Sequence, residues 1–179
     1  RREMTPFFSD VQGFSTISEG LTPEELVQLL NEYLTAMCEI ISSHNGTIDK
    51  FEGDAIIAFW GAPLELPNHA STACFATLEM QKRGEELRKM LLEQNRPMLH
   101  TRMGLNSGPV VVGNMGSADR MDYTMMGDVV NLAARLEGAN KFYKTFTMIS
   151  GSTYELAKDD IDCRELDILR VVGKKEPVQ

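Results

Sequence analysis

Cysteine is scarce in this chain of 179 residues, and its three cysteines stand far apart. No C-x-x-C pair occurs among Cys38, Cys74 and Cys163, so the sequence indicates neither a zinc site nor a dithiol redox motif. Cys38 and Cys74 lie within apolar helical patterns, where we expect them to be small core residues. This sparse use of cysteine predicts a reducing compartment, and we expect the chain to be cytoplasmic.

Basic residues and long apolar runs are also few. Lysine and arginine number 18 against 26 acidic residues, which gives a net charge of −8. No basic stripe is present, which argues against a nucleic-acid partner because phosphate contacts dominate such binding. The apolar runs extend over a few residues, whereas a membrane-spanning helix needs about 20. We therefore expect no direct membrane contact by this domain.

Two sequence patterns that would point to other architectures or chemistries are missing. Nothing repeats at the period of 20–50 residues that is typical of solenoids. No G-x-x-x-x-G-K-[ST] loop occurs, which excludes P-loop chemistry. What remains is ordinary globular composition, 42% hydrophobic and 25% charged. The length predicts a single domain over residues 1–179.

The hydrophobic pattern predicts an alternation of strands and helices. Thr22-Pro23-Glu24-Glu25 is a strong helix start, with Thr22 as N-cap and Glu25 closing a capping box, and the helix should run to about Ser43. Strands are predicted at 4–9, 47–51, 55–60, 99–107, 110–112, 123–126, 146–149 and 166–172, and further helices at about 68–93, 128–143 and 150–157. This order predicts an α+β fold with a ferredoxin-like βαββαβ core, a mainly antiparallel sheet covered by helices, and extra C-terminal strands.

Two acidic residues stand out by position. Asp10 ends the first apolar strand, and Asp54 follows Gly53 at the tip of the second hairpin. A lone carboxylate at a strand end is usually a solvated turn former. Two that converge would suit Mg²⁺ or Mn²⁺, which prefer oxygen ligands and keep positions open for substrate phosphates. Spacing alone does not establish that they meet.

A third candidate feature lies on the helix that begins after Gly127. Asn131 and Arg135 are four residues apart and therefore project from one helix face. Such a pair could hold a phosphate group. The alternative is a solvated helix face with Arg135 paired to a nearby glutamate.

Three motifs that occur in a fixed order along the chain favour the ligand-binding interpretation of these residues over the solvated one. They are FFSDVQGFS (residues 7–15), DKFEGDAIIAFWG (residues 49–61) and YTMMGDVVNLAARLE (residues 123–137). Together they resemble the class III nucleotide cyclases, the family of adenylate and guanylate cyclase catalytic domains, over about residues 4–177. The segments GAP (61–63), HTRMGLNSGPVVVGNMGS (100–117) and VVGKKEPV (171–178) are similar to the bacterial branch.

The resemblance implies a metal site and a phosphate site near the first two motifs. Asp10 and Asp54 match the two metal-binding aspartates, and the Val11 carbonyl matches a backbone ligand. Two Mg²⁺ or Mn²⁺ ions per active site are implied. Gly13 and Phe14 lie where backbone amides of the family meet the terminal phosphates.

The resemblance also implies the substrate. Lys50 matches the residue that reads the purine, and Thr124 stands where its partner Asp or Thr does. Lysine and threonine complement the N1 acceptor and N6 donor of adenine. The guanylate cyclases of the family have Glu and Cys at these two positions instead. Asn131 and Arg135 match the pair that positions the ribose and stabilises the transition state. We therefore expect an adenylate cyclase that converts ATP to 3′,5′-cyclic AMP and pyrophosphate.

Two residues depart from the family pattern. Many members carry a lysine just before the glycine near the C-terminus, where it touches the triphosphate; Val172 stands there, and Lys174 is the substitute we expect. Pro6 is unusual within a first strand, since proline donates no ladder hydrogen bond.

The resemblance further implies a homodimer whose two sites are shared between protomers. We expect the chain to be a fragment of a longer protein with an upstream regulatory domain; the cytoplasmic domain of a membrane-anchored receptor is one form of this expectation. A guanylate cyclase and a catalytically silent nucleotide-binding dimer are the alternatives. Lys50 disfavours the first, and the presence of Asp10, Asp54, Asn131 and Arg135 disfavours the second.

Overall fold

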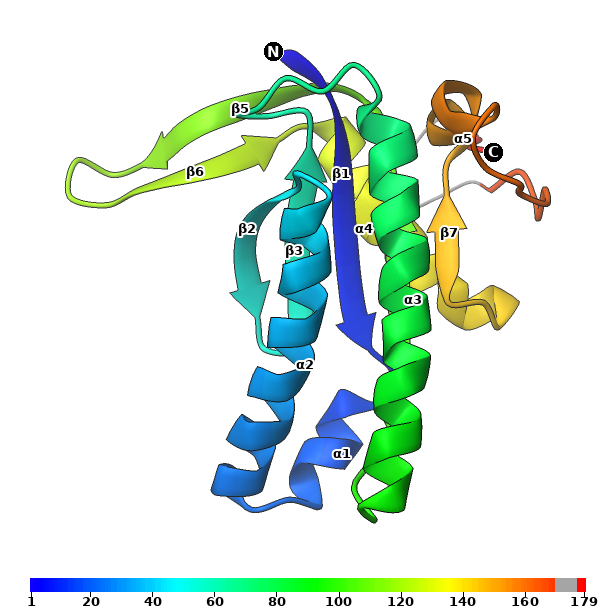
Figure 1. Ribbon diagram of the computed structural model, residues 1–179. Coiled ribbons are helices and arrows are strands. Elements are labelled where there is room, and N and C mark those ends of the chain that lie inside the picture. Colours follow the sequence, from blue (N-terminus) through cyan, green and yellow to red (C-terminus); the bar gives the residue numbers. More distant parts are fainter. Residues whose placement is uncertain (170–176) are drawn as a thin grey trace.

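A sheet of seven strands with five helices around it makes up the part of the chain that the computed structural model describes, residues 1–169 and 177–179 (Figure 1). The strands are β1 (Arg2–Val11), β2 (Thr47–Glu52), β3 (Ala55–Trp60), β4 (Thr101–Leu105), β5 (Gly108–Gly116), β6 (Met121–Met126) and β7 (Thr147–Ile149). The helices are α1 (Phe14–Glu19), α2 (Pro23–Ser43), α3 (His69–Glu93), α4 (Asp128–Tyr143) and α5 (Gly151–Ala157).

The strand order confirms the predicted fold class. The main path of the sheet is β2-β3-β1-β4-β7, and its first four members have the order of a ferredoxin-like βαββαβ core. The β4–β7 pair is parallel, while the other strand pairs are antiparallel. Strand β1 is therefore the centre of the sheet, with β3 on one side and β4 and β5 on the other.

Helices cover both faces of this sheet. Figure 1 shows α2 and α3 side by side on one face and α4 behind the sheet on the other. The largest core cluster lies under α2 and α3, where the fully buried rings of Phe7 and Trp60 meet edge to face at 6.0 Å. Helix α2 begins with the capping box expected of Thr22 and Glu25. The long apolar faces of these two helices thus fix one side of β1 and β3.

Pro6 lies in the central strand, between the residues that pair with β5 and those that pair with β4. Its carbonyl accepts a hydrogen bond from the Asn106 amide at 3.3 Å, so its nitrogen also faces the β4–β5 side of β1. On that side Met4 pairs with Gly108 of β5 and Phe7 pairs with Leu105 of β4. Pro6 therefore stands where β1 passes from one neighbouring strand to the other, and its missing N–H is tolerated.

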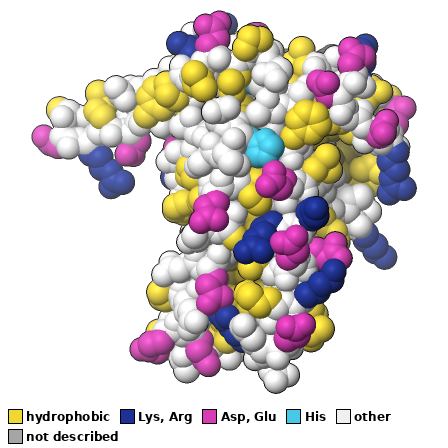
Figure 2. Space-filling view, in the orientation of Figure 1, with side chains coloured by type: hydrophobic (Ala, Val, Ile, Leu, Met, Phe, Trp, Pro, Cys, Tyr) yellow, Lys and Arg dark blue, Asp and Glu magenta, His cyan; other side chains and the backbone are white. Residues whose placement is uncertain are grey.

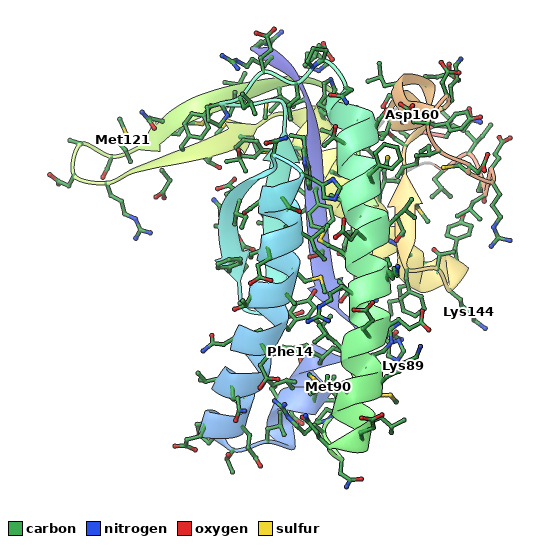
Figure 3. The ribbon with its side chains drawn as sticks, in the orientation of Figure 1. Phe14, Lys89, Met90, Met121, Lys144 and Asp160 are labelled. Carbon is green, nitrogen blue, oxygen red and sulfur yellow. The ribbon has the colours of Figure 1, made fainter. Side chains whose placement is uncertain are left out.

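Strands β5 and β6 form a hairpin, here called the arm, that projects away from the rest of the sheet (Figure 1). Only the start of β1 joins β5 to the sheet, through pairs such as Arg2 with Val110. Exposed apolar side chains lie along the arm: Val111, Met121, Tyr123 and Met126. Figure 2 shows hydrophobic surface along the arm, and Figure 3 shows Met121 far out on it.

Two elements differ from the sequence-based expectation. The short helix α1, which starts after the turn at Gln12 and Gly13, was not predicted from the sequence. The strand expected at residues 166–172 is observed only as a single antiparallel bridge between Leu169 and Val178. Residues 166–168 are irregular, and 170–172 lie outside the described residues. Across residues 1–169 and 177–179, no helix combines the length and apolarity needed to cross a membrane.

Gly104 fixes the distance between β4 and α4. A Cβ atom placed there would lie 2.6 Å from the Ala133 carbonyl oxygen and 2.7 Å from the Glu137 Cα, both in the α4 backbone. We predict that Gly104→Ala lowers the free energy of unfolding by about 1–3 kcal/mol, because backbone atoms cannot yield as a side chain does. Chemical denaturation of the purified chain measures this change.

Gly138, also on α4, provides the matched control. A Cβ there meets nothing within 4 Å. Gly138→Ala should raise the free energy of unfolding by up to about 1 kcal/mol, since alanine favours the helix. Equal effects of the two substitutions would contradict the close-approach explanation.

Candidate active site

Asp10 and Asp54, whose meeting the residue spacing left open, lie at the same edge of the sheet. Asp10 is near the end of β1, and Asp54 follows Gly53, whose φ of +64° makes the turn of the β2–β3 hairpin. The backbone N–H of Val11 donates a hydrogen bond to Asp54 Oδ2 at 2.7 Å. This bond ties the hairpin tip to the end of β1 and holds both carboxylates at one edge of the sheet.

Arg102, which the sequence analysis did not single out, holds the Asp10 side chain. The two residues are directly opposite each other in the β1–β4 register. Arg102 Nε donates to Asp10 Oδ1 at 3.1 Å, and its Nη2 donates to Oδ2 at 3.3 Å. This forked pair fixes the orientation of the Asp10 carboxylate.

A third carboxyl reaches the same place from α4. Glu137 Oε1 lies 3.4 Å from Arg102 Nε, and the Glu137 side chain is 14% exposed. This Glu137 atom has no hydrogen-bond partner in the described part of the chain, whereas Arg102 donates two hydrogen bonds to Asp10. Burial, together with the adjoining carboxyl of Asp10, raises the pKa of Glu137 to about 8. The carboxyls of Asp10 and Glu137 thus both face the Arg102 guanidinium, and the Asp54 carboxylate lies next to Val11 at the same edge of the sheet.

The donor atoms at this edge fit a hard divalent cation. Carboxylate oxygens of Asp10 and Asp54 and a backbone carbonyl are the ligands that Mg²⁺ and Mn²⁺ prefer, with substrate phosphates and waters completing the coordination. Among the described residues, no group of three or more His, Cys, Asp and Glu side chains is arranged to hold a metal by itself. A cation held by two carboxylates keeps coordination positions open for water and for substrate phosphates.

The turn after β1 presents backbone groups next to these carboxylates. Gly13 has a φ of +67°, a conformation that favours glycine, and it is the N-cap of α1, which starts at Phe14. The preceding Gln12 N–H is already bonded to the His100 carbonyl at 2.7 Å. The first amides of α1 therefore lie within a few residues of Asp10.

Lys50 and Thr124, the expected base-reading pair, come together around a residue that the sequence analysis did not consider. Thr124 Oγ1 donates to Asp49 Oδ2 at 2.6 Å. Lys50 Nζ lies 3.6 Å from Asp49 Oδ1, and the Asp49 side chain is only 3% exposed. A buried carboxylate thus joins β2 to β6 and holds both side chains.

Asn131 and Arg135 lie on α4, which begins after Gly127. Asn131 is exposed and Arg135 is half-buried. The Arg135 Nη1 atom is buried, and within residues 1–169 and 177–179 it has no hydrogen-bond partner. The alternative in which Arg135 is paired to a nearby glutamate is not observed among these residues. A guanidinium nitrogen without a protein partner is available to an anion.

The site residues of this chain form two separate groups. No hydrogen bond or ion pair between described residues joins the Asp10–Asp54 group to the Asp49–Lys50–Thr124 group. Lys174 and Val172 lie outside the described residues, so the expected phosphate contact of Lys174 stays a prediction. Among the described residues, the Asp10–Asp54 group and the Asp49–Lys50–Thr124 group are thus not linked by side-chain contacts.

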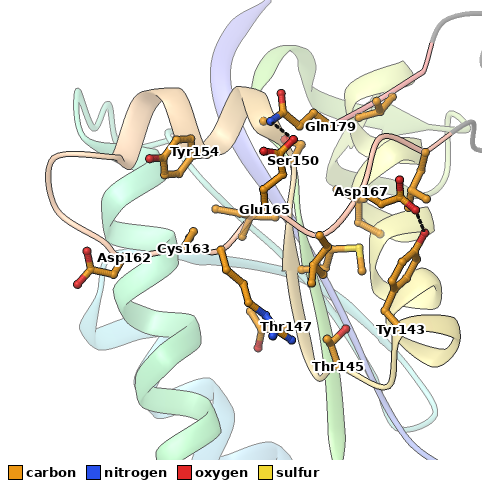
Figure 4. Close-up of a pocket in the computed structure, with 18 of the residues that line it drawn as sticks. Tyr143, Thr145, Thr147, Ser150, Tyr154, Asp162, Cys163, Glu165, Asp167 and Gln179 are labelled. Atoms are coloured by element: carbon orange, nitrogen blue, oxygen red, sulfur yellow. Dashed lines mark hydrogen bonds between the residues drawn. The ribbon is translucent and has the colours of Figure 1, made fainter.

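A cavity lies in another part of the described structure. It has a volume of about 480 Å³ and is bounded by α4, β7, α5 and the segment 162–169, with Tyr143, Ser150 and Tyr154 on its wall (Figure 4). Tyr143 donates a hydrogen bond to Asp167 across one side of it. None of the expected site residues in the described part of the chain lines this cavity, so it is separate from the carboxylate edge.

Comparison with known proteins identifies the family. The family model described as "Adenylate and Guanylate cyclase catalytic domain" matches residues 1–179. The chain belongs to this family. This cyclase domain is 40% identical to "Adenylate cyclase 1" of Rhizobium meliloti (strain 1021) over 174 residues, which cover 97% of the chain but 26% of that relative.

Two solved structures are similar to the cyclase domain over almost its whole length. The adenylyl cyclase CyaB from P. aeruginosa superimposes with a TM-score of 0.92 at 42% identity, covering 99% of this chain and 91% of the other. The guanylyl cyclase Cya2 superimposes with a TM-score of 0.91 at 38% identity, covering 99% and 89%. The fold of the cyclase domain is thus shared by proteins named for different nucleotides.

Sequence reasoning missed Asp49, Arg102 and Glu137, although all three lie inside segments that carried the family resemblance. Asp49 opens DKFEGD, Arg102 is in HTRMG, and Glu137 ends AARLE. Arg102 could have been found only with the β1–β4 register, which places it opposite Asp10. Their position within the motifs was the one indication in the sequence that these residues belong to the site, and it does not reveal which side chains are in contact.

A divalent cation should stabilise this cyclase domain through the carboxylate edge. A ligand that binds the folded state at 100 times its dissociation constant adds about 2.7 kcal/mol to the free energy of unfolding. We predict that Mn²⁺ raises the thermal midpoint of the wild type and that Asp54→Asn abolishes most of this rise. Thermal unfolding across a Mn²⁺ titration, without nucleotide, provides the measurement.

The matched control is Asp159→Asn, which makes the same change at an exposed residue beyond α5. Its Mn²⁺-dependent rise should equal that of the wild type. A full rise in Asp54→Asn would rule out this carboxylate as a cation ligand.

Proposed function

We propose that this domain is an adenylate cyclase that converts ATP to 3′,5′-cyclic AMP and pyrophosphate. The observation that carries the proposal is the meeting of Lys50 and Thr124 at one buried carboxylate. An ammonium donor and a hydroxyl oxygen side by side complement adenine, whose N1 accepts and whose N6 donates. The proteins named adenylate cyclase among its relatives support the same substrate.

The residues of the carboxylate edge supply the metal-binding part of the proposed mechanism. Asp10, Asp54 and the Val11 carbonyl would hold two Mg²⁺ or Mn²⁺ ions. When bound, such ions lower the pKa of an attacking hydroxyl and neutralise the charge of the polyphosphate. Arg102 keeps the Asp10 carboxylate oriented toward that task.

The other site residues bind the nucleotide as it reacts. The 3′-oxygen of ATP bonds to its own α-phosphorus, while the bond from that phosphorus to the bridging oxygen of pyrophosphate breaks. Asn131 orients the ribose, and Arg135 stabilises the charge that grows on the α-phosphate, a contribution of about 3–4 kcal/mol for such groups. The amides at Gly13 and Phe14 bind the terminal phosphates, together with Lys174.

The metal-binding carboxylates provide the first test of this activity. Asp10→Ala and Asp54→Ala should each reduce cyclic AMP formation to less than about a tenth of wild type, because the electrostatic stabilisation they support is worth several kcal/mol. The assay incubates each chain with ATP and Mn²⁺ and identifies the product by chromatography, with circular dichroism to check folding. Asp159→Asn should retain full activity. Cyclic GMP from GTP as the faster product would make the domain a guanylate cyclase instead.

We further propose that the active unit is a head-to-tail homodimer. Asp10 and Asp54 would come from one protomer, with Lys50, Thr124, Asn131 and Arg135 from its partner. Two observations support this: no hydrogen bond or ion pair between described residues joins the carboxylate group to the Lys50–Thr124 group, and the arm exposes apolar side chains that a second copy would cover (Figure 2). Sharing a site lets small rotations between protomers control activity.

We also propose that residues 1–179 form one catalytic domain of a longer cytoplasmic protein with an upstream regulatory domain. The family model matches the whole of this range. The chain spans 26% of the length of the Rhizobium relative, which supports the presence of further segments.

Complementation tests the shared site. Asp54→Ala chains and Arg135→Ala chains should each be inactive alone. A mixed dimer has one site with both changes and one site with neither, so activity should return when the two are mixed. With random pairing about half the dimers are mixed, which gives about a quarter of wild-type activity. No recovery, where subunit exchange is demonstrated, would mean that each site is built within one chain.

A further inference from the structure

We infer that Asp49 is a specificity-determining residue, which sets Thr124 to accept rather than donate a hydrogen bond at the purine. The inference rests on the proposed adenylate cyclase function and deepens it. It starts from the 2.6 Å hydrogen bond in which Thr124 Oγ1 is the donor and Asp49 Oδ2 the acceptor. A hydroxyl has a single proton, and an ionised carboxylate can only accept. The Thr124 proton is therefore committed to Asp49.

Because its proton is bonded to Asp49, Thr124 can only accept a hydrogen bond from a ligand. Its oxygen keeps lone pairs, so toward an incoming base it acts as an acceptor. The 6-amino group of adenine is a donor and satisfies that oxygen. The 6-carbonyl of guanine is an acceptor, and two acceptors face to face repel. Threonine without Asp49 would have no such preference, because its hydroxyl could rotate to suit either base.

Burial stabilises the hydrogen bond from Thr124 to Asp49. The Asp49 side chain is 3% exposed, so water cannot readily replace Thr124 as its donor. Asp49 Oδ1 has no hydrogen-bond partner in the described part of the chain, and the nearest cation is Lys50 Nζ at 3.6 Å. Lys50 itself is 43% exposed in its side chain and keeps donors for a ligand. One carboxylate thus leaves a donor at Lys50 and an acceptor at Thr124.

An irregularity in β2 permits this geometry. The β2–β3 register shifts between Ile48 and Lys50, which makes Asp49 an extra residue in the strand. Consecutive residues of a regular strand point to opposite faces, whereas a bulge redirects them. Asp49 and Lys50 can therefore both reach toward β6 and Thr124.

The test measures a selectivity ratio, kcat/KM for ATP divided by kcat/KM for GTP. Asp49→Asn keeps the size of the side chain but adds a donor, so Thr124 becomes free to donate to the guanine carbonyl. We expect the ratio to fall at least about tenfold, since a polar mismatch in a site that reads hydrogen bonds is costly. The same change at an exposed position, Asp159→Asn, should leave the ratio unchanged.

A double-mutant cycle separates this role from a general structural one. Thr124→Val removes the hydroxyl while keeping the shape of the side chain. In the Thr124→Val background most of the effect of Asp49→Asn on the ratio should disappear, because no hydroxyl remains to be oriented. An unchanged ratio in Asp49→Asn, or an undiminished effect in the Thr124→Val background, would overturn the inference.

A second measurement needs no change at Asp49 and covers the case in which Asp49→Asn does not fold. Purine riboside triphosphate lacks the 6-amino group and keeps the N1 acceptor. The wild type should prefer ATP over it by at least about fivefold, and Thr124→Val should bring the two close to equal. Equal use of both by the wild type would overturn the inference.

The outcomes also separate this inference from the proposed function. Cyclic AMP formation with a ratio that Asp49→Asn does not move would remove the inference alone. A wild type with no cyclase activity on either nucleotide would remove both.

Discussion

The position of β1 in the sheet is the constraint on which the rest of this domain depends. Its last residues face Arg102 of β4 on one side and reach the hairpin tip of β2–β3 on the other, through the bond from Val11 N–H to Asp54. Both candidate metal ligands are therefore set by backbone register rather than by flexible loops. A shift of one residue in that register would turn Asp10 to the opposite face and away from Arg102.

Most of the fold could be predicted from the sequence, because its elements carry local signals. The capping box at Thr22 and the glycine turn before Asp54 both formed as expected. Helix α1 was missed because its six residues are too few for an apolar period to emerge. The polar contacts of the site were harder to anticipate. Arg102 and Asp49 act through strand register and a bulge, which depend on partners far away in the sequence.

The site also contains buried polar groups whose hydrogen-bonding capacity the described residues leave unused. Arg135 Nη1 and Asp49 Oδ1 are buried without hydrogen bonds among the described residues, and Glu137 keeps its proton to a higher pH than usual. Unsatisfied buried groups of this kind lower stability. They are tolerated where a ligand, a cation or a second copy of the chain completes them. Of the four such atoms among the described residues, three lie on α4 and β2, and the fourth is Ser9 Oγ of β1.

The central place of β1 has a consequence for how the chain folds. Within this domain Arg2–Val11 precedes all of its partners, which lie around residues 56–60, 101–105 and 108–110. Pairs between residues so distant in sequence require the closure of long loops, which slows folding. During synthesis this strand can pair with β3 well before β4 and β5 exist, so one edge of the strand that organises the finished sheet stays open to misassociation in the meantime.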